Sequence, residues 1–303
     1  MLSPAQQRLV LDLFPDGTRI RAVVPLQQHY TPCPLRVQVL LPDATEQVVV
    51  LRLARHDQHG VAKEAQLYPL LAQLGLPVPQ VLAEPRTDPD APELGEMSVL
   101  SLLPGRNLQA WSAESPAGLE LACRLVIDAV GRLQQLTAPI MQIAHTGVIP
   151  QVTLADELRA IEESGSVWLQ DEIFRAALTF LKPRMAHSDL PLVFSNGDYQ
   201  PANFLSDGRQ LTGFVDFEGV CFEDPYIGFA KYRIYDIHPC TSAGIVERYL
   251  AYCGGDEAIF APRLGLRCLS TLQGEISLSS QEDAAYRDHV KTLLRGALIQ
   301  MAS

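Results

Sequence analysis

Short apolar runs rich in β-branched residues alternate with polar breaks over about the first hundred positions of the chain. Such runs predict strands, and the short breaks between them, many with proline or aspartate, favour an antiparallel arrangement. The predicted strands cover residues 18–24, 35–41, 47–53, 79–83 and 97–103. Leucines at helical spacing over 61–74, followed by Gly75 as a C-terminal cap, predict one helix between the third and fourth strands. Pro69 inside that helix predicts a kink or a late start, because proline has no backbone N–H to donate.

Beyond Pro104-Gly105 the apolar positions follow a helical period over most of the remaining chain. The predicted helices cover a segment that begins near residue 117, and then residues 154–161, 167–181, 226–235, 243–253, 262–276 and 283–302. Strands first and helices later indicate an α+β fold with two lobes, which the length of 303 residues also suits. We therefore expect a small antiparallel β-sheet lobe over 1–103 and a larger, mainly helical lobe over 104–303.

The composition is that of an ordinary globular protein, with 47% hydrophobic and 19% charged residues. No apolar run approaches the roughly 18 residues that cross a bilayer, and the first residues lack the pattern of a signal peptide, so we expect a cytoplasmic protein without a membrane partner. A formal net charge of -11 disfavours nucleic acid as a partner, because phosphate binding needs clustered lysine and arginine, and weakly favours a cationic small molecule. The six cysteines form no C-x-x-C pair, which argues against a zinc ribbon or a redox dithiol.

The candidate chemistry lies between residues 193 and 225, where one apolar run ends in a turn at Asp198 and Asn203 follows five residues later. A second apolar run then delivers Asp216 and Glu218. Carboxylates gathered on short loops resist ionisation without a counter-ion, and carboxylate and carboxamide oxygens are the ligands that Mg2+ prefers. Phosphoryl transfer uses such a set. In such a reaction we expect Asp198 to accept the proton of an alcohol, and we expect Asn203 and Asp216 to bind the metal. Glu218 either assists the metal or serves as a structural acceptor.

This stretch resembles the catalytic motif of the aminoglycoside phosphotransferase and choline kinase group, which are distant relatives of protein kinases. The family pattern H-G-D-x-x-P-x-N, followed by I-D-x-[DE], matches Asn196-Gly197-Asp198-Tyr199-Gln200-Pro201-Ala202-Asn203 and Val215-Asp216-Phe217-Glu218. The resemblance implies a two-lobed protein-kinase-like fold. It also implies a catalytic role for Asp198, with Mg2+ bound by Asn203 and Asp216.

Weaker similarities lie upstream of the motif. Arg52 stands in a strand that resembles the one offering the phosphate-binding cation, and Glu64 on the following helix resembles its ion-pair partner. A structural ion pair is the alternative for these two residues. The segment 98–105 resembles the strand against which the nucleotide base lies, which gives Ser101, Leu102 and Leu103 as nucleotide-binding residues. The resemblance therefore implies ATP or GTP as the donor and a hydroxyl of a small molecule, aminoglycoside-like or another metabolite, as the acceptor.

Three features depart from the family pattern. Asn196 replaces the motif histidine, and Gly228 replaces the second aspartate of D-P-x-x-D-L-A. The segment 27–34 contains no glycine, although a phosphate loop needs close backbone approach. Two functions therefore stand beside each other: an O-phosphotransferase that moves the γ-phosphate, and a catalytically degenerate kinase-like module that binds nucleotide or metabolite without phosphoryl transfer. A Mg-dependent hydrolase is a third alternative, which lacks an independent nucleophile. The sequence leaves the oligomeric state open.

Overall fold

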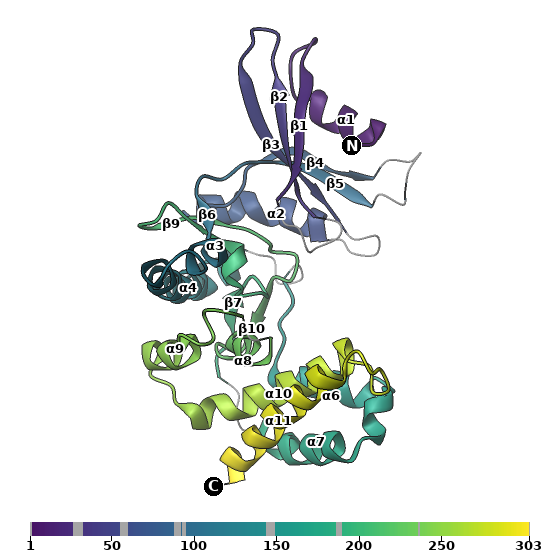
Figure 1. Ribbon diagram of the computed structural model, residues 1–303, viewed down its shortest axis with the longest axis vertical. Helices are drawn as coiled ribbons and strands as arrows, with labels where there is room; N and C mark the ends of the chain where they lie inside the picture. The colour runs from purple at the N-terminus through teal and green to yellow at the C-terminus, as the bar shows by residue number, and fades with distance from the viewer. Residues whose placement is uncertain are drawn as a thin grey trace. The chain divides into compact units, whose positions relative to one another are not determined.

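The computed structural model describes residues 2–26, 33–54, 60–87, 92, 95–143, 149–185, 190–235 and 237–302 (Figure 1). The chain forms two compact units, one of Met1–Asn107 with Ala202–Gly219, the other of Leu108–Pro201 with Val220–Ser303. The predicted catalytic motif therefore contributes residues to both units. The predicted boundary between two lobes at residues 103 and 104 stays a prediction.

In the first unit one antiparallel sheet has the strand order β1-β2-β3-β5-β4 (Figure 1). The strands are β1 (Arg19–Pro25), β2 (Leu35–Leu40), β3 (Glu46–Leu53), β4 (Val81–Thr87) and β5 (Glu96–Ser101). Each predicted strand is present, although β4 extends further into the polar connection than expected. Helix α1 (Pro4–Leu11) was not predicted. It begins at a capping box between Ser3 and Gln6 and buries Leu9 and Val10 in one core with sheet residues such as Val37.

Helix α2 (Gly60–Gln73) contacts strands β4 and β5. Because side chains alternate across a strand, β3 directs Leu51 into the core shared with α1, whereas the neighbouring Arg52 reaches α2. The helix continues through Pro69, and it already includes Gly60, so the predicted late start is wrong. Pro69 lies on an exposed part of the helix surface, where a proline ring displaces no core packing.

A second, three-stranded sheet belongs to the same unit and has the order β6-β8-β9. Its strands are β6 (Arg106–Asn107), β8 (Phe204–Ser206) and β9 (Leu211–Phe214). The backbone N–H of Phe214 donates to the carbonyl of Pro77 at 2.8 Å, and the Thr212 hydroxyl donates to the carbonyl of Pro104 at 2.7 Å. These bonds fix residues 202–219 to the N-terminal part of the chain, and the first unit thereby receives half of the catalytic motif.

The second unit is mainly helical. Its helices are α3 (Leu108–Ser112), α4 (Pro116–Gln135), α5 (Thr137–Ile143), α6 (Leu154–Glu163), α7 (Glu172–Met185), α8 (Ala230–Ile234), α9 (Ile245–Cys253), α10 (Glu257–Glu275) and α11 (Ala284–Ala302). Helices α10 and α11 pack along each other (Figure 1), and a small ribbon pairs β7 (Val193–Ser195) with β10 (Cys221–Glu223). Among the described residues, no helix combines the length and the apolar character needed to cross a membrane.

Two predicted helices of this unit are interrupted. The helix expected over 167–181 consists of a 3-10 turn, Val167–Gln170, and the separate helix α7. Asp171 breaks it, because its backbone is extended and its carboxylate accepts from the N–H of Phe174 at 3.0 Å, as a helix cap does. The helix expected over 226–235 likewise consists of a 3-10 turn, Ile227–Phe229, followed by α8.

Candidate active site

Arg52 gathers three carboxylates in the first unit. Its Nε lies 2.9 Å from Oε2 of Glu64, and its Nη2 lies 3.0 Å from Oδ1 of Asp216. The same Nη2 lies 3.1 Å from Oε2 of Glu218. We call these four residues the Arg52 centre. It brings together the predicted cation, its predicted helix partner and two predicted metal ligands, which are far apart in the sequence.

The loop that carries Asp216 is held tightly. Glu64 is only 2% exposed, and its Oε1 accepts from the backbone N–H of Phe217 at 2.9 Å. Asp216 has a φ of 64°, a left-handed conformation that costs a residue other than glycine about 1 to 3 kcal/mol. The ring of Tyr68 meets that of Phe217 edge-on, with centroids 5.9 Å apart. The surrounding contacts thus impose a strained backbone at the position whose carboxylate is predicted to bind metal.

The charge of Arg52 is fixed by its partners. Burial disfavours the charged guanidinium, but hydrogen bonding and charge at Glu64, together with the charge of Asp216, outweigh it and raise the pKa of Arg52. Lys63 adds a second cation, because its Nζ donates to the backbone carbonyl of Glu218 at 2.9 Å. The glycine at position 60 leaves room for this arrangement, since a Cβ there would lie 2.7 Å from the Cβ of Glu218.

Asn203 also belongs to the first unit. It is 4% exposed, and its carbonyl accepts from the N–H of Val215 at 3.0 Å, which places it across the β8–β9 ladder from the residue before Asp216. The carboxamide of Asn203 and the carboxylate of Asp216 are hard oxygen donors of the kind that Mg2+ takes. In the described ranges, no three His, Cys, Asp or Glu side chains are arranged to hold a metal. The types of donor atom fit Mg2+, and in the structure Arg52 is a partner of the Asp216 and Glu218 carboxylates.

Asp198 lies in the second unit, after β7. The buried carboxamide of Asn196 donates to the carbonyl of Asp198 at 2.9 Å and accepts from its N–H at 3.3 Å. Asn196 therefore fixes the backbone of this turn with local bonds, where the family pattern has histidine. The carboxylate of Asp198 is paired with Lys231 of α8, whose Nζ lies 2.9 Å from its Oδ1.

The replacement of aspartate by Gly228 also has a structural reason. A Cβ at this position would lie 2.5 Å from the ring of Tyr199, which is 1% exposed. The backbone carbonyl of Tyr199 accepts from the hydroxyl of Tyr232 at 2.7 Å. The aromatic ring that follows Asp198 thus fills the space that a side chain would need, and these contacts connect the Asp198 turn to helix α8.

The three predicted nucleotide-binding residues follow one another at the end of β5, in the first unit. The N–H of Ser101 donates to the carbonyl of Gln80 at 2.9 Å, and the N–H of Gln80 donates to the hydroxyl of Ser101 at 2.9 Å. Leu102 is 41% exposed. Leu103 packs on Gly213, where an added Cβ would lie 2.8 Å from its Cδ1. The structure places these residues on one rigid edge, and their contact with nucleotide stays a prediction.

Two functional candidates were missed by the sequence analysis. Lys231 contacts Asp198, and Lys63 contacts the backbone of Glu218. Neither lysine carries a periodic or motif signal, because each acts through a contact with a distant part of the chain. The segment 27–34, which lacks the expected glycine, is outside the described residues for positions 27–32.

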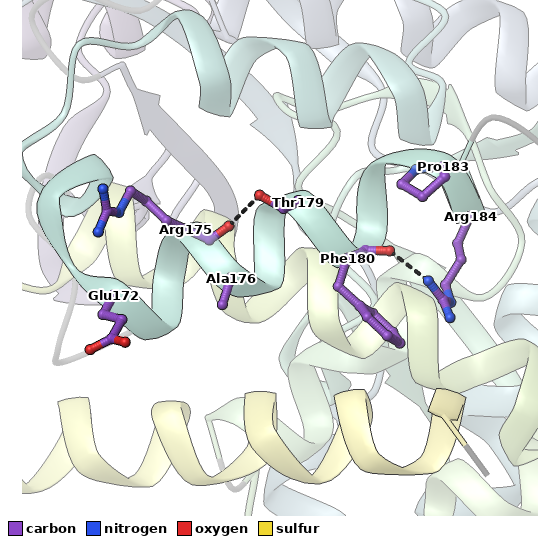
Figure 2. Close-up of a pocket in the computed structure, with 7 residues that line it drawn as sticks. All are labelled: Glu172, Arg175, Ala176, Thr179, Phe180, Pro183 and Arg184. Carbon is purple, nitrogen blue, oxygen red and sulfur yellow. Dashed lines mark hydrogen bonds between the residues drawn. The ribbon is translucent and has the colours of Figure 1, made fainter.

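A shallow pocket of about 760 Å³ lies along α7 in the second unit (Figure 2). Its lining residues are Glu172, Arg175, Ala176, Thr179, Phe180, Pro183 and Arg184. The guanidinium of Arg184 lies 3.5 Å from the centroid of the Phe180 ring. None of the predicted site residues lines this pocket, so its size gives no support to the candidate site.

Comparison with known proteins identifies the family. The model of the phosphotransferase enzyme family matches residues 34–261, more than half of the chain. No curated protein sequence matches the chain significantly.

Solved structures share the fold. The apo form of a thermostable mutant of aminoglycoside phosphotransferase APH(4)-Ia has a TM-score of 0.66 at 15% identity, covering 94% of this chain and 96% of that one. A variant of the same thermostable protein in ternary complex with ADP and hygromycin B gives 0.67 at 13% identity, covering 98% and 99%. The GDP and kanamycin complex of APH(2")-IIia gives 0.61 at 19% identity, covering 99% of both chains. The chain belongs to the phosphotransferase enzyme family, and it shares the protein-kinase-like fold of the aminoglycoside phosphotransferases.

Proposed function

We propose that the protein is a Mg2+-dependent O-phosphotransferase that moves the γ-phosphate of ATP or GTP to a hydroxyl of a small molecule, aminoglycoside-like or another metabolite. The observation that carries this proposal is the Arg52 centre, in which one guanidinium lies 3.0 Å from Asp216 and 2.9 Å from Glu64. A cation anchored by a buried glutamate, beside a carboxylate with hard oxygens, is the arrangement that phosphoryl transfer uses. The ADP and GDP complexes of two structural neighbours support a nucleotide donor.

Each residue has a separate task in this proposal. Asp198 orients the acceptor hydroxyl and takes its proton, while the acceptor oxygen forms a bond to the γ-phosphorus and the bond from that phosphorus to the bridging oxygen breaks, releasing nucleoside diphosphate. Asn203 and Asp216, with Glu218 as an additional oxygen donor, would hold Mg2+, which supplies charge neutralisation for the phosphates when bound. Arg52, held by Glu64, provides a fixed positive charge for the same phosphates.

The nucleobase is assigned to the edge formed by Ser101, Leu102 and Leu103. The exposed Leu102 offers an apolar surface, and the hydrogen bonds between Ser101 and Gln80 hold the backbone of this edge in place. Adenine and guanine both stack on apolar side chains, which leaves ATP and GTP open as donors.

A transfer assay tests the proposal. Purified protein with Mg2+ and either ATP or GTP is incubated with a panel of hydroxyl-bearing compounds, and phosphorylated product is detected by mass spectrometry. We expect at least one acceptor to gain a phosphate, and we expect Asp198→Asn to lower kcat by roughly 10² to 10⁴-fold, as the loss of a general base does. The melting temperature of the variant serves as the folding control. The proposal fails if no acceptor in the panel is phosphorylated, or if the variant is as active as the parent.

One observation favours a second candidate, a kinase-like module that binds nucleotide or metabolite without transfer. Arg52 already hydrogen-bonds one oxygen of Asp216 and one of Glu218. Mg2+ must therefore share these carboxylates with Arg52 or displace it. Thermal shift with Mg-ATP and Mg-GTP separates the candidates, because a ligand at a hundred times its Kd stabilises the folded state by about 2.7 kcal/mol. Stabilisation without any product in the transfer assay supports the module, whereas product formation excludes it.

We place the enzyme in the cytoplasm. All six cysteines are free thiols in the structure. Free thiols and a nucleoside triphosphate donor both suit a reducing compartment.

A further inference from the structure

Lys231 is the partner of the predicted catalytic carboxylate. Its Nζ lies 2.9 Å from Oδ1 of Asp198 and 3.5 Å from the carbonyl of Gly197. The Lys231 side chain is 16% exposed, and that of Asp198 is 27% exposed. A lysine that reaches both the carboxylate and the backbone of one turn is held at two points, unlike a lysine on a solvated surface.

The helix that carries Lys231 is fixed to the same turn by a second set of contacts. The next residue, Tyr232, donates its hydroxyl to the carbonyl of Tyr199, at 2.7 Å. Three residues before Lys231, Gly228 lies against the ring of Tyr199. Because Tyr199 directly follows Asp198, these contacts hold the backbone of Lys231 and the backbone of Asp198 in register. The ammonium is therefore positioned by the fold rather than by its own flexible chain.

The Lys231 ammonium forms an ion pair with the Asp198 carboxylate. The charge of Lys231 also acts on the buried carboxyl group of Glu223. Burial raises the pKa of Glu223 despite a hydrogen bond from Ser195 and the charges of Arg267 and Lys231, so the protonated form of Glu223 is favoured relative to an ordinary glutamate. The direct contact of the ammonium is with Asp198, whose Oδ1 lies 2.9 Å from Nζ.

We propose that Lys231 is a positioning residue for Asp198 and that it makes the enzyme select acceptors whose reacting hydroxyl has no cationic amine beside it. The inference rests on the proposed function of Asp198. A lone carboxylate attracts a cationic amine, whereas the paired carboxylate has no net charge to offer and presents an ammonium that repels one. The reacting hydroxyl is therefore one with neutral or anionic neighbours, as in a polyol, a sugar or a hydroxy acid, rather than a hydroxyl that lies beside an amine.

The reaction itself is unchanged by this assignment. The acceptor proton still passes to Asp198, and Lys231 keeps its own proton throughout. Its contribution is to hold the Asp198 carboxylate in one orientation, which is an effect on the chemical step and not on nucleotide binding. We therefore expect removal of the Lys231 side chain to lower kcat and to leave the KM for nucleotide unchanged.

The second unit contains a matched control for the experiment. Lys291 of α11 pairs with Asp171 at 2.6 Å, and both side chains are 15% exposed. Asp171 caps helix α7, so this pair has a structural role. Lys291→Met removes a lysine–aspartate pair of similar burial without touching the residues assigned to transfer.

The test uses matched acceptors, each a neutral sugar and the amino sugar with the amine beside the same hydroxyl. Wild type, Lys231→Met, Lys231→Arg and Lys291→Met are compared for kcat and KM with each acceptor. We expect the wild type to favour the neutral member by about tenfold or more in kcat/KM, as the repulsion of like charges predicts. We expect Lys231→Met to lower kcat for the neutral acceptor at least about tenfold and to reduce the preference between the two acceptors. Lys231→Arg should keep the preference, and Lys291→Met should keep both the rate and the preference.

The outcomes are distinct. If Lys231→Met retains the rate and the preference of the wild type, or if the wild type favours the amino sugar, the inference is overturned while the proposed function stands. If the wild type phosphorylates no acceptor at all, the proposed function fails, and this inference fails with it.

Discussion

The Arg52 centre and the Asp198–Lys231 pair differ in the ratio of carboxylates to cations. In the first unit the Arg52 guanidinium contacts the carboxylates of Glu64, Asp216 and Glu218, and these three carboxylates outnumber Arg52 and the neighbouring Lys63. In the second unit the Lys231 ammonium pairs with the Asp198 carboxylate. An excess of oxygen charge suits an added divalent cation, whereas a balanced pair holds a carboxylate in place without attracting one.

Burial differs between the two as well. The Glu64 side chain is 2% exposed, whereas that of Asp198 is 27% exposed. A buried carboxylate that loses its cation stays in a poorly solvated site, while a partly exposed one regains water. The Arg52 centre should therefore matter for both stability and transfer, and the Asp198–Lys231 pair mainly for transfer.

The largest expected effect on stability comes from Arg52→Met. This change leaves Glu64 buried without its cation, and we expect a loss of about 3 to 5 kcal/mol in the free energy of unfolding. Lys231→Met should cost less, because the Asp198 carboxylate is 27% exposed and regains water when its partner is removed. Urea denaturation of both variants measures the difference. Equal losses in the two variants would show that burial does not distinguish the two regions.

The residues of the Arg52 centre were easier to predict from the sequence than those of the Asp198–Lys231 pair, for a physical reason. The four residues of the Arg52 centre were each predicted as site residues, because they occupy fixed positions in a motif, on a strand and on the helix that follows it, but the contacts of Arg52 with Asp216 and Glu218 were not predicted. Lys231 was missed, since its role arises from the packing of Tyr199 on Gly228, which no spacing reports. Helix α1 was missed likewise, because its eight residues show little apolar periodicity and depend on the sheet for burial.

The departures at Asn196 and Gly228 illustrate the same limit. Each looked like the loss of a functional group in the sequence. In the structure, Asn196 makes two hydrogen bonds to the backbone of Asp198, and Gly228 makes room for Tyr199. A motif position can thus change while the geometry it supports is kept by another contact.

A smaller effect is expected from Gly228→Ala, which tests whether packing holds the Asp198 turn. The added methyl group would lie 2.5 Å from the Tyr199 ring, and we expect a loss of about 1 to 3 kcal/mol in the free energy of unfolding. Gly296→Ala in α11 is the control. It has open space around the added Cβ and should stabilise the protein by about 0.5 to 1 kcal/mol, because alanine favours a helix. Thermal or urea unfolding of both variants gives the comparison, and two stabilising changes would contradict the proposed packing.

The smallest effect concerns Glu223, and it asks whether Lys231 serves Asp198 alone. Burial raises the pKa of Glu223 above its ordinary value of 4.5, so the folded state binds the proton more tightly than the unfolded state. The contribution of Glu223 to stability is therefore complete below pH 4.5 and is lost as the pH rises through the folded pKa. Glu223→Gln should reduce this loss, so the variant should gain stability relative to the wild type as the pH rises from 5 to neutrality.

The same variant also has a catalytic readout. Because Lys231 is assigned to Asp198 at 2.9 Å, Glu223→Gln should leave the preference for neutral over amine-bearing acceptors unchanged, while Lys231→Met reduces it. Unfolding curves at several pH values and the acceptor comparison are measured on one preparation. If Glu223→Gln alters the acceptor preference as much as Lys231→Met does, then the lysine charge is shared between the two carboxyl groups. The Asp198–Lys231 pair would then no longer be the one-to-one arrangement that distinguishes it from the Arg52 centre.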